Sequence, residues 1–241
     1  MKRLHFIFAL FALILFSGCG LETYYTLNPP PRAINAPVYT SVDYTANYFE
    51  FESATNNNSD SSFLFLGTAV YYRIYADSSV MLSRRASISS VNTTSDYSAA
   101  ALRMIGYGYQ QLNTSDGSVQ PLITAEGATV RIRLTNYGDA NDANNDYRAT
   151  ISVINKIPRR TLGNNKTFDF GRRDKSAYGP SENYALPVSG DEDFESGTVT
   201  DNKYYVDMYA VAIGRDTTYT TYYSNVLHLG SVPIDASLEN N

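Results

Sequence analysis

Histidine is the side chain that most often moves protons in enzymes, and this chain offers one candidate beyond its N-terminal segment. His228 lies between Leu227 and Leu229 in a stretch with strand-like alternation. We therefore expect its side chain to point away from the leucine face, toward solvent. A serine triad also needs a placed serine and carboxylate, and no Gly-x-Ser-x-Gly motif occurs. We predict no catalytic residue and no enzymatic activity.

An acidic loop provides the strongest candidate for a metal site. Asp142, Asn144 and Asp146 alternate in the way that the first three ligands of a calcium-binding loop do. The sixth position holds Tyr147 instead of glycine, and no glutamate stands at the twelfth, so the EF-hand pattern fails. A polar hairpin turn explains the same residues, and no other spacing predicts a metal site.

Tyrosines form the main candidate binding surface, near the C-terminal end of the chain. The candidate residues are Tyr205, Tyr209, Tyr219, Tyr222 and Tyr223. Tryptophan, which carbohydrate platforms often use, is absent from the chain. We interpret the tyrosines first as edge-strand packing and second as a protein-binding surface.

Arginines occur in three adjacent pairs, at 84–85, 159–160 and 172–173. Gathered together, they would bind anions such as glycan or lipid headgroups. Because the chain carries a net charge of −5, pairing with local carboxylates is the simpler interpretation.

The N-terminus has the order of a secretion signal. Lys2 and Arg3 precede the apolar run 4–16, which ends in Ser17-Gly18-Cys19. The run of about 13 residues is shorter than the roughly 17–25 that a membrane-spanning helix needs. We predict that residues 1–18 are removed as a signal peptide.

The cleavage region resembles the lipobox of bacterial lipoproteins, in which a small residue and glycine precede a cysteine. Phe16, Ser17 and Gly18 stand at the lipobox positions, with Phe16 in place of the preferred leucine. The resemblance implies that Cys19, the single cysteine of the chain, carries diacylglycerol and an amide-linked acyl chain such as palmitate. Gly20, by the same resemblance, permits sorting to the outer membrane in preference to the inner one. An ordinary secretory signal with a coincidental cysteine is the alternative.

Composition indicates a protein rich in strands and turns. The 21 tyrosines and 11 phenylalanines accompany only 18% charged residues, which is typical of strands and turns. The acidic balance lacks the clustered basic excess of a nucleic-acid-binding protein. No cofactor is predicted apart from the covalent lipid on Cys19, and with that thiol acylated no disulfide forms within the chain.

Alternation of apolar and polar residues predicts several strands. The clearest lie in 49–52, in the run FLFLGTAVYYRIYA at 63–76, and in KYYVDMYAVAIGRD at 203–216. Residues 130–134 and 149–153 flank the acidic loop and are expected to form a hairpin. A helix is expected from Ser95 or Asp96 to Gly106, with Tyr97, Ala101, Leu102 and Ile105 on one face. Pro29-Pro30-Pro31 predicts an extended stalk over residues 19–37.

The last two expected strands resemble those of fibronectin type III domains. Tyr204, Val206 and Ala210 match the first of them and 224–229, SNVLHL, the second, while 69–75, AVYYRIY, resembles the third strand of that fold. The resemblance implies a mainly all-β fold, a fibronectin type III or immunoglobulin-like β-sandwich over residues 38–230. Residues 77–202 would form a long β-rich insertion or subdomain with one short helix, and residues 231–241 a flexible tail.

This layout of lipobox, stalk and β-sandwich resembles poorly characterised lipoproteins of spirochaetes. We therefore predict an envelope lipoprotein, anchored to the membrane by lipid, that binds a protein or glycan. The alternative is a structural or accessory subunit of a periplasmic or outer-membrane assembly. A glycan hydrolase with two carboxylates is the third hypothesis.

Overall fold

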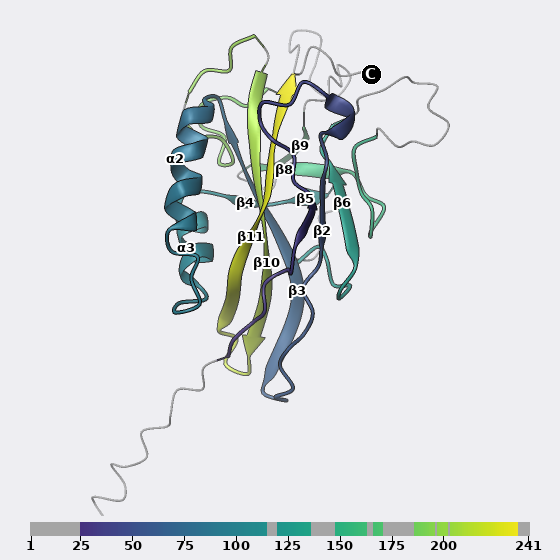
Figure 1. Ribbon diagram of the computed structural model, residues 1–241, viewed down its shortest axis with the longest axis vertical. Coiled ribbons are helices and arrows are strands. Elements are labelled where there is room, and N and C mark those ends of the chain that lie inside the picture. The colour runs from purple at the N-terminus through teal and green to yellow at the C-terminus, as the bar shows by residue number, and fades with distance from the viewer. Residues whose placement is uncertain are drawn as a thin grey trace, which may run out of the picture.

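Two antiparallel four-stranded sheets pack face to face, and a pair of helices covers the outer face of the longer sheet in the computed structural model (Figure 1). The structure describes residues 25–114, 120–135, 148–162, 166–170, 186–195, 197–201 and 203–235. The predicted mainly β-sandwich fold is confirmed by this arrangement.

The long sheet has the strand order β11-β10-β3-β4. Its strands are β3 (Phe63–Tyr75), β4 (Gln110–Gln111), β10 (Lys203–Asp216) and β11 (Thr221–Asp235). Its central strand β10 pairs with β3 along almost its whole length, from Tyr205 opposite Tyr75 to Asp216 opposite Phe63. This is the order of the G, F, C and C′ strands of an immunoglobulin-like sandwich.

The short sheet has the order β1-β2-β6-β7. Its strands are β1 (Ala33–Asn35), β2 (Phe49–Glu52), β6 (Thr129–Arg133) and β7 (Thr150–Ile151). Phe49 and Phe51 of β2 are fully buried, as their alternation with glutamates predicts. The pairing of Ile132 with Ile151 confirms the hairpin expected around the acidic loop. That loop itself, with Asp142, Asn144 and Asp146, lies outside the described residues.

Both faces of the long sheet are buried. One face packs against the short sheet through residues such as Tyr72, Ile74 and Val206. The other packs against the helices through residues such as Tyr71 and Val211. Burial on both faces explains why β3 and β10 read as nearly continuous apolar runs instead of alternating ones.

Two helices cover the outer face, α2 (Ser78–Ser89) and α3 (Ala99–Gly106). Helix α3 confirms the predicted helix and its end at Gly106, but its buried residues are Ala100, Ala101 and Met104. The predicted face was wrong at Leu102, which is 55% exposed. Helix α2 was not predicted, and Asp77 caps it by accepting a hydrogen bond of 2.7 Å from the Ser79 backbone nitrogen. No helix in the described ranges has the length and apolarity that crossing a bilayer requires.

The segment 77–202, predicted to be an insertion or subdomain, contributes strands to both sheets. Strand β4 extends the long sheet, while β6 and β7 extend the short one. A third, three-stranded sheet has the order β5-β8-β9. It consists of β5 (Asn113–Thr114), β8 (Pro158–Leu162) and β9 (Lys166–Asp169).

Both ends of the described chain join the sandwich more closely than expected. The stalk predicted over residues 19–37 is wrong from Leu27 onward, because Leu27 is buried and β1 pairs with β2. The tail predicted over residues 231–241 is wrong at its start, because β11 continues to Asp235 opposite Lys203. Apolar burial outweighs the local preferences of proline and polar residues at both ends.

Candidate functional site: an uncharged groove beside a buried carboxylate

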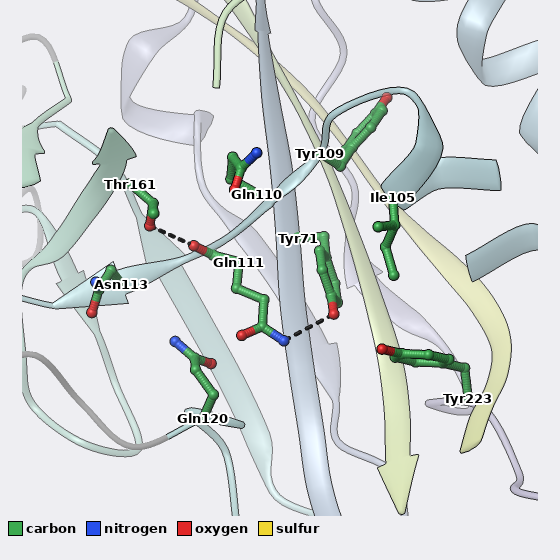
Figure 2. Close-up of a pocket in the computed structure, with 9 residues that line it drawn as sticks. All are labelled: Tyr71, Ile105, Tyr109, Gln110, Gln111, Asn113, Gln120, Thr161 and Tyr223. Carbon is green, nitrogen blue, oxygen red and sulfur yellow. Dashed lines mark hydrogen bonds between the residues drawn. The ribbon is translucent and has the colours of Figure 1, made fainter. Parts of the chain in front are cut away.

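An open groove of about 420 Å³ lies where α3, the β4 edge of the long sheet and the third sheet meet (Figure 2). Its nine lining residues are uncharged side chains: Tyr71, Ile105, Tyr109, Gln110, Gln111, Asn113, Gln120, Thr161 and Tyr223. The volume falls within the roughly 300–1,000 Å³ typical of small-ligand sites. Of these nine residues, only Tyr223 was predicted from the sequence to belong to a site.

One wall of the groove consists of amide and hydroxyl groups. Gln111 donates from Nε2 to the Tyr71 hydroxyl at 2.8 Å, and Thr161 donates from its hydroxyl to the Gln111 backbone oxygen at 2.8 Å (Figure 2). Gln120 donates from Nε2 to the Leu112 oxygen at 2.9 Å. Its Oε1 is buried and accepts no hydrogen bond from the described part of the chain. This wall therefore keeps spare hydrogen-bonding capacity.

The opposite wall is aromatic and aliphatic. Tyr71 comes from β3, Tyr223 from β11 and Ile105 from α3, so three elements position it. Burial, with a further contribution from Tyr223, raises the pKa of Tyr71 well above its ordinary value. The hydroxyl of Tyr71 therefore stays neutral and remains a hydrogen-bond donor at physiological pH.

A fully buried carboxylate lies behind the groove. Asp207 of β10 accepts hydrogen bonds at Oδ1 from Arg85 Nη2 (3.0 Å), His228 Nε2 (2.9 Å) and the Ser231 hydroxyl (2.5 Å). At Oδ2 it accepts one from the Tyr109 hydroxyl, at 2.7 Å. We call these five residues the Asp207 cluster. Through Tyr109 this cluster reaches the groove, although in Figure 2 the Tyr109 hydroxyl points away from the other lining side chains.

The electrostatics of Asp207 reflect its partners. Burial alone would raise its pKa, but the hydrogen bond and charge of His228, the charge of Arg85 and the hydrogen bond of Ser231 outweigh it. The pKa of Asp207 is therefore lower than its ordinary value, and the carboxylate is ionised at neutral pH. The buried charge is compensated locally, which favours a structural role.

His228 was expected to point toward solvent, but its side chain is only partly exposed and contacts other residues. The side chain is 29% exposed, but Nε2 bonds to Asp207 and the ring packs 4.9 Å from the Tyr209 ring. Ser231 donates its hydroxyl to Asp207 and not to His228. Serine, histidine and aspartate thus meet here without the serine-to-histidine bond that activates a nucleophile.

A second buried charge pair joins the third sheet to the sandwich. Arg160 contacts Asp193 twice, from Nε at 2.9 Å and from Nη2 at 2.7 Å, and also contacts Asp191. Tyr72 donates to the same Asp193 carboxylate at 2.7 Å. Burial opposes the charge of Arg160, but Asp193 raises the pKa of the guanidinium overall. This geometry supports the interpretation that Arg160 pairs with a local carboxylate.

The other arginine pairs follow the same interpretation where the structure describes them. Arg84 bonds to Glu195 at 3.1 Å, and its guanidinium lies 4.4 Å from the Tyr107 ring centroid. Arg85 belongs to the Asp207 cluster. The pair 172–173 lies outside the described residues. Among the described arginines of these pairs, Arg84, Arg85 and Arg160 are each paired with a carboxylate.

The predicted tyrosine surface is dispersed. Tyr209 is buried at 2% exposure, so including it was wrong. Tyr205 packs edge-on against Tyr39, and Tyr222 packs against Tyr25 and Phe63. Tyr219 is exposed in the β10–β11 turn. Tyr223 alone of the five lines the groove.

The remaining predicted sites lie outside the described residues. They are the lipobox residues Phe16, Ser17 and Gly18, the lipidation residue Cys19, and the calcium candidates Asp142, Asn144 and Asp146. Within the described ranges, no three His, Cys, Asp or Glu side chains are grouped to hold a metal ion.

Comparisons with known proteins return no match, whether with protein-family models, with curated proteins or with solved structures.

Proposed function

We propose that this chain is a lipid-anchored, non-enzymatic binding module of a bacterial envelope, and that its groove holds an uncharged glycan. The observation that carries the proposal is the lining of the groove, in which tyrosine, amide and hydroxyl groups occur without any charged side chain. Small-ligand sites combine apolar walls with a few convergent polar groups in this way.

Amide side chains suit sugar hydroxyls because both groups donate and accept hydrogen bonds. The buried Gln120 Oε1 offers an acceptor without a partner in the described part of the chain, and a sugar hydroxyl would satisfy it. The Tyr71 hydroxyl accepts a hydrogen bond from Gln111, which holds the Gln111 amide in the groove wall. An anionic sugar would leave its charge without a cation among the lining residues.

The aromatic wall suits the apolar C–H face of a sugar ring. Tyr223 and Ile105 are partly exposed in the groove, while Tyr71 is buried behind them. A tyrosine face gives a broad contact at low conformational cost. The five predicted tyrosines do not form one continuous aromatic surface, which was the argument for a protein partner. The uncharged groove therefore favours a glycan as the ligand.

The non-enzymatic part of the proposal rests on how the carboxylates are used. Asp207 is saturated by its four partners, and Asp193 is held by Arg160 and Tyr72. A hydrolase needs two carboxyl groups that face a substrate from a cleft. The membrane anchor rests on the resemblance of residues 16–19 to a lipobox.

Binding is tested by titrating the lipidated protein, held in phosphatidylcholine nanodiscs, with neutral and anionic oligosaccharides. A neutral oligosaccharide is expected to bind, and Gln111→Ala and Tyr223→Ala are each expected to weaken binding about fivefold or more. Tyr219→Ala, outside the groove, is the matched control and should bind as the wild type does. Binding of peptides in the groove, with no sugar bound, would replace the glycan by a protein partner.

Anchoring is tested by labelling cells with a palmitate analogue. The wild-type protein should incorporate the label, and a Cys19→Ala variant should not. Protease accessibility on intact cells then assigns the membrane side: digestion places the sandwich outside, and protection until the outer membrane is opened places it in the periplasm. Label retained in the Cys19→Ala variant would contradict the anchor.

A further inference from the structure

The first described residue, Tyr25, is fixed at one end of the sandwich. Its ring stacks on Phe63 at a centroid distance of 4.7 Å and packs edge-on against Tyr222 at 5.4 Å. Its hydroxyl bonds to the Ser62 hydroxyl. Figure 1 shows the described chain starting at the same end as the start of β3 and the β10–β11 turn. The segment that leads to Cys19 therefore leaves the body at this end.

The tether from Cys19 to the body is short. The six residues from 20 to 25 span at most about 20 Å, even when fully extended. The 15 residues of β11, which run from this end toward the other, measure about 50 Å. A lipid on Cys19 therefore keeps this end of the sandwich close to the membrane surface.

Exposed apolar side chains occur at this same end. Tyr219 in the β10–β11 turn is 74% exposed, and Leu64 at the start of β3 is 52% exposed. The Arg215 guanidinium lies 5.1 Å from the Tyr219 ring centroid, and Arg215 pairs with Leu64 across the sheet. Tyrosine and arginine both suit the boundary between headgroups and water. We call Leu64, Arg215 and Tyr219 the tip.

We propose that the tip rests in the headgroup layer of the membrane that holds Cys19, so that the sandwich stands upright on its lipid anchor. This inference rests on the lipidation part of the proposed function and is independent of the ligand in the groove. It adds a noncovalent contact to the covalent one, and two attachments restrict the tilt of the body.

The charges around the tip indicate which lipid headgroups it can contact. Asp60 is exposed and Asp216 partly exposed there, and hydrogen bonds from Ser62 and Thr218 lower the pKa of the respective carboxyls. Both carboxylates are therefore negative at neutral pH, whereas Arg215 is the one cation among the three described tip residues. Anionic headgroups would repel them, so the tip fits a zwitterionic surface.

The chain contains no tryptophan, so a single introduced tryptophan reports on its own surroundings. Two reporters belong at the tip, Tyr219→Trp and Leu64→Trp. Two matched controls lie at exposed positions elsewhere, Val42→Trp beside the 3₁₀ turn η1 (Tyr44–Ala46) and Leu102→Trp on α3; these wild-type side chains are 88% and 55% exposed. Figure 1 places η1, the dark blue turn, at the end opposite the tip.

Each lipidated variant is incorporated into phosphatidylcholine vesicles with brominated acyl chains, and its fluorescence is compared with that in unbrominated vesicles. The tip reporters should lose about half of their emission or more, because interfacial groups reach roughly 5–10 Å into the acyl boundary. The two controls should lose less than about a tenth by the same distance argument.

Flotation of the vesicles tests the lipid anchor separately from the upright orientation. If the lipidated protein floats and the tip reporters are not quenched, the upright orientation is wrong while the anchor stands. Quenching of Val42→Trp or Leu102→Trp instead would show that another face lies on the membrane, which also overturns the inference. If the protein carries no lipid and does not float, anchor and inference both fail.

Discussion

At the Asp207 cluster, one carboxylate receives hydrogen bonds from four side chains. In the adjoining groove, Gln111 and Gln120 each donate one hydrogen bond from the side chain, and Gln120 Oε1 accepts none in the described part of the chain. The two regions share Tyr109, but the polar groups of the cluster are hydrogen-bonded within the protein, whereas those of the groove are only partly so. Saturated polar groups hold elements together, whereas groups with spare capacity are available to a ligand. Substitutions in each region therefore should have different effects.

The largest effect is expected from Asp207→Asn. This variant keeps the shape of the side chain but removes the charge that Arg85 faces, and an amide nitrogen replaces one acceptor. Breaking a buried ion pair costs about 3–5 kcal/mol of unfolding free energy. Denaturant titration measures it, with Glu52→Gln as control because the exposed Arg32–Glu52 pair is worth less than about 1 kcal/mol. A loss as small as that of the control would remove the distinction between cluster and groove.

Acid should reproduce part of this effect in the wild-type protein. The pKa of Asp207 is lower in the folded protein than its ordinary value of 3.8. Its contribution to stability is therefore complete above about pH 3.8 and decreases as the pH falls through the lower folded value. The difference in unfolding free energy between wild type and Asp207→Asn should shrink over that range. A constant difference from pH 7 to pH 2 would show that the charge of Asp207 does not stabilise the fold.

An intermediate loss of unfolding free energy is expected from Tyr109→Phe, and Tyr209→Phe is its matched control. Tyr109 and Tyr209 are both 2% exposed, and their ring centroids lie 5.5 Å apart. Tyr109 donates to Asp207, whereas the buried Tyr209 hydroxyl has no hydrogen-bond partner in the described ranges. Tyr109→Phe should cost about 1.5–3 kcal/mol and Tyr209→Phe close to nothing. Equal losses in the two variants would show that the hydrogen bond from Tyr109 to Asp207 adds no stability beyond that of an unpaired buried hydroxyl.

Sequence patterns predicted the sheet framework because its physical signal is local. Phe49 and Phe51 alternate with glutamates on a strand that has one buried face, so period two is visible. The same logic failed for Tyr209, because α2 and α3 cover the second face of β10 and leave no outward side. Helix α2 escaped prediction because only Met81 and Ile88 are buried along it.

The candidate site could not be predicted, because its residues are distant in sequence. Thr161 and Gln111, which bond in the groove wall, are 50 positions apart, and Arg85 and Asp207 are 122 apart. Glutamine and asparagine at these positions look like ordinary surface residues until the fold brings them together. One signal was available for the cluster: Asp207 is an acidic residue inside the apolar run 204–213, where a buried charge needs a partner.

Within the groove wall, only a small effect on stability is expected from Gln111→Ala. The side chain donates one neutral hydrogen bond to Tyr71 at the open edge of the groove, where water can replace it. The unfolding free energy should therefore fall by about 1 kcal/mol or less. The same variant should weaken glycan binding about fivefold or more, so folding and binding separate at this residue. A destabilisation as large as that of Asp207→Asn would mean that the groove wall belongs to the framework, and the ligand would have to be sought on another surface.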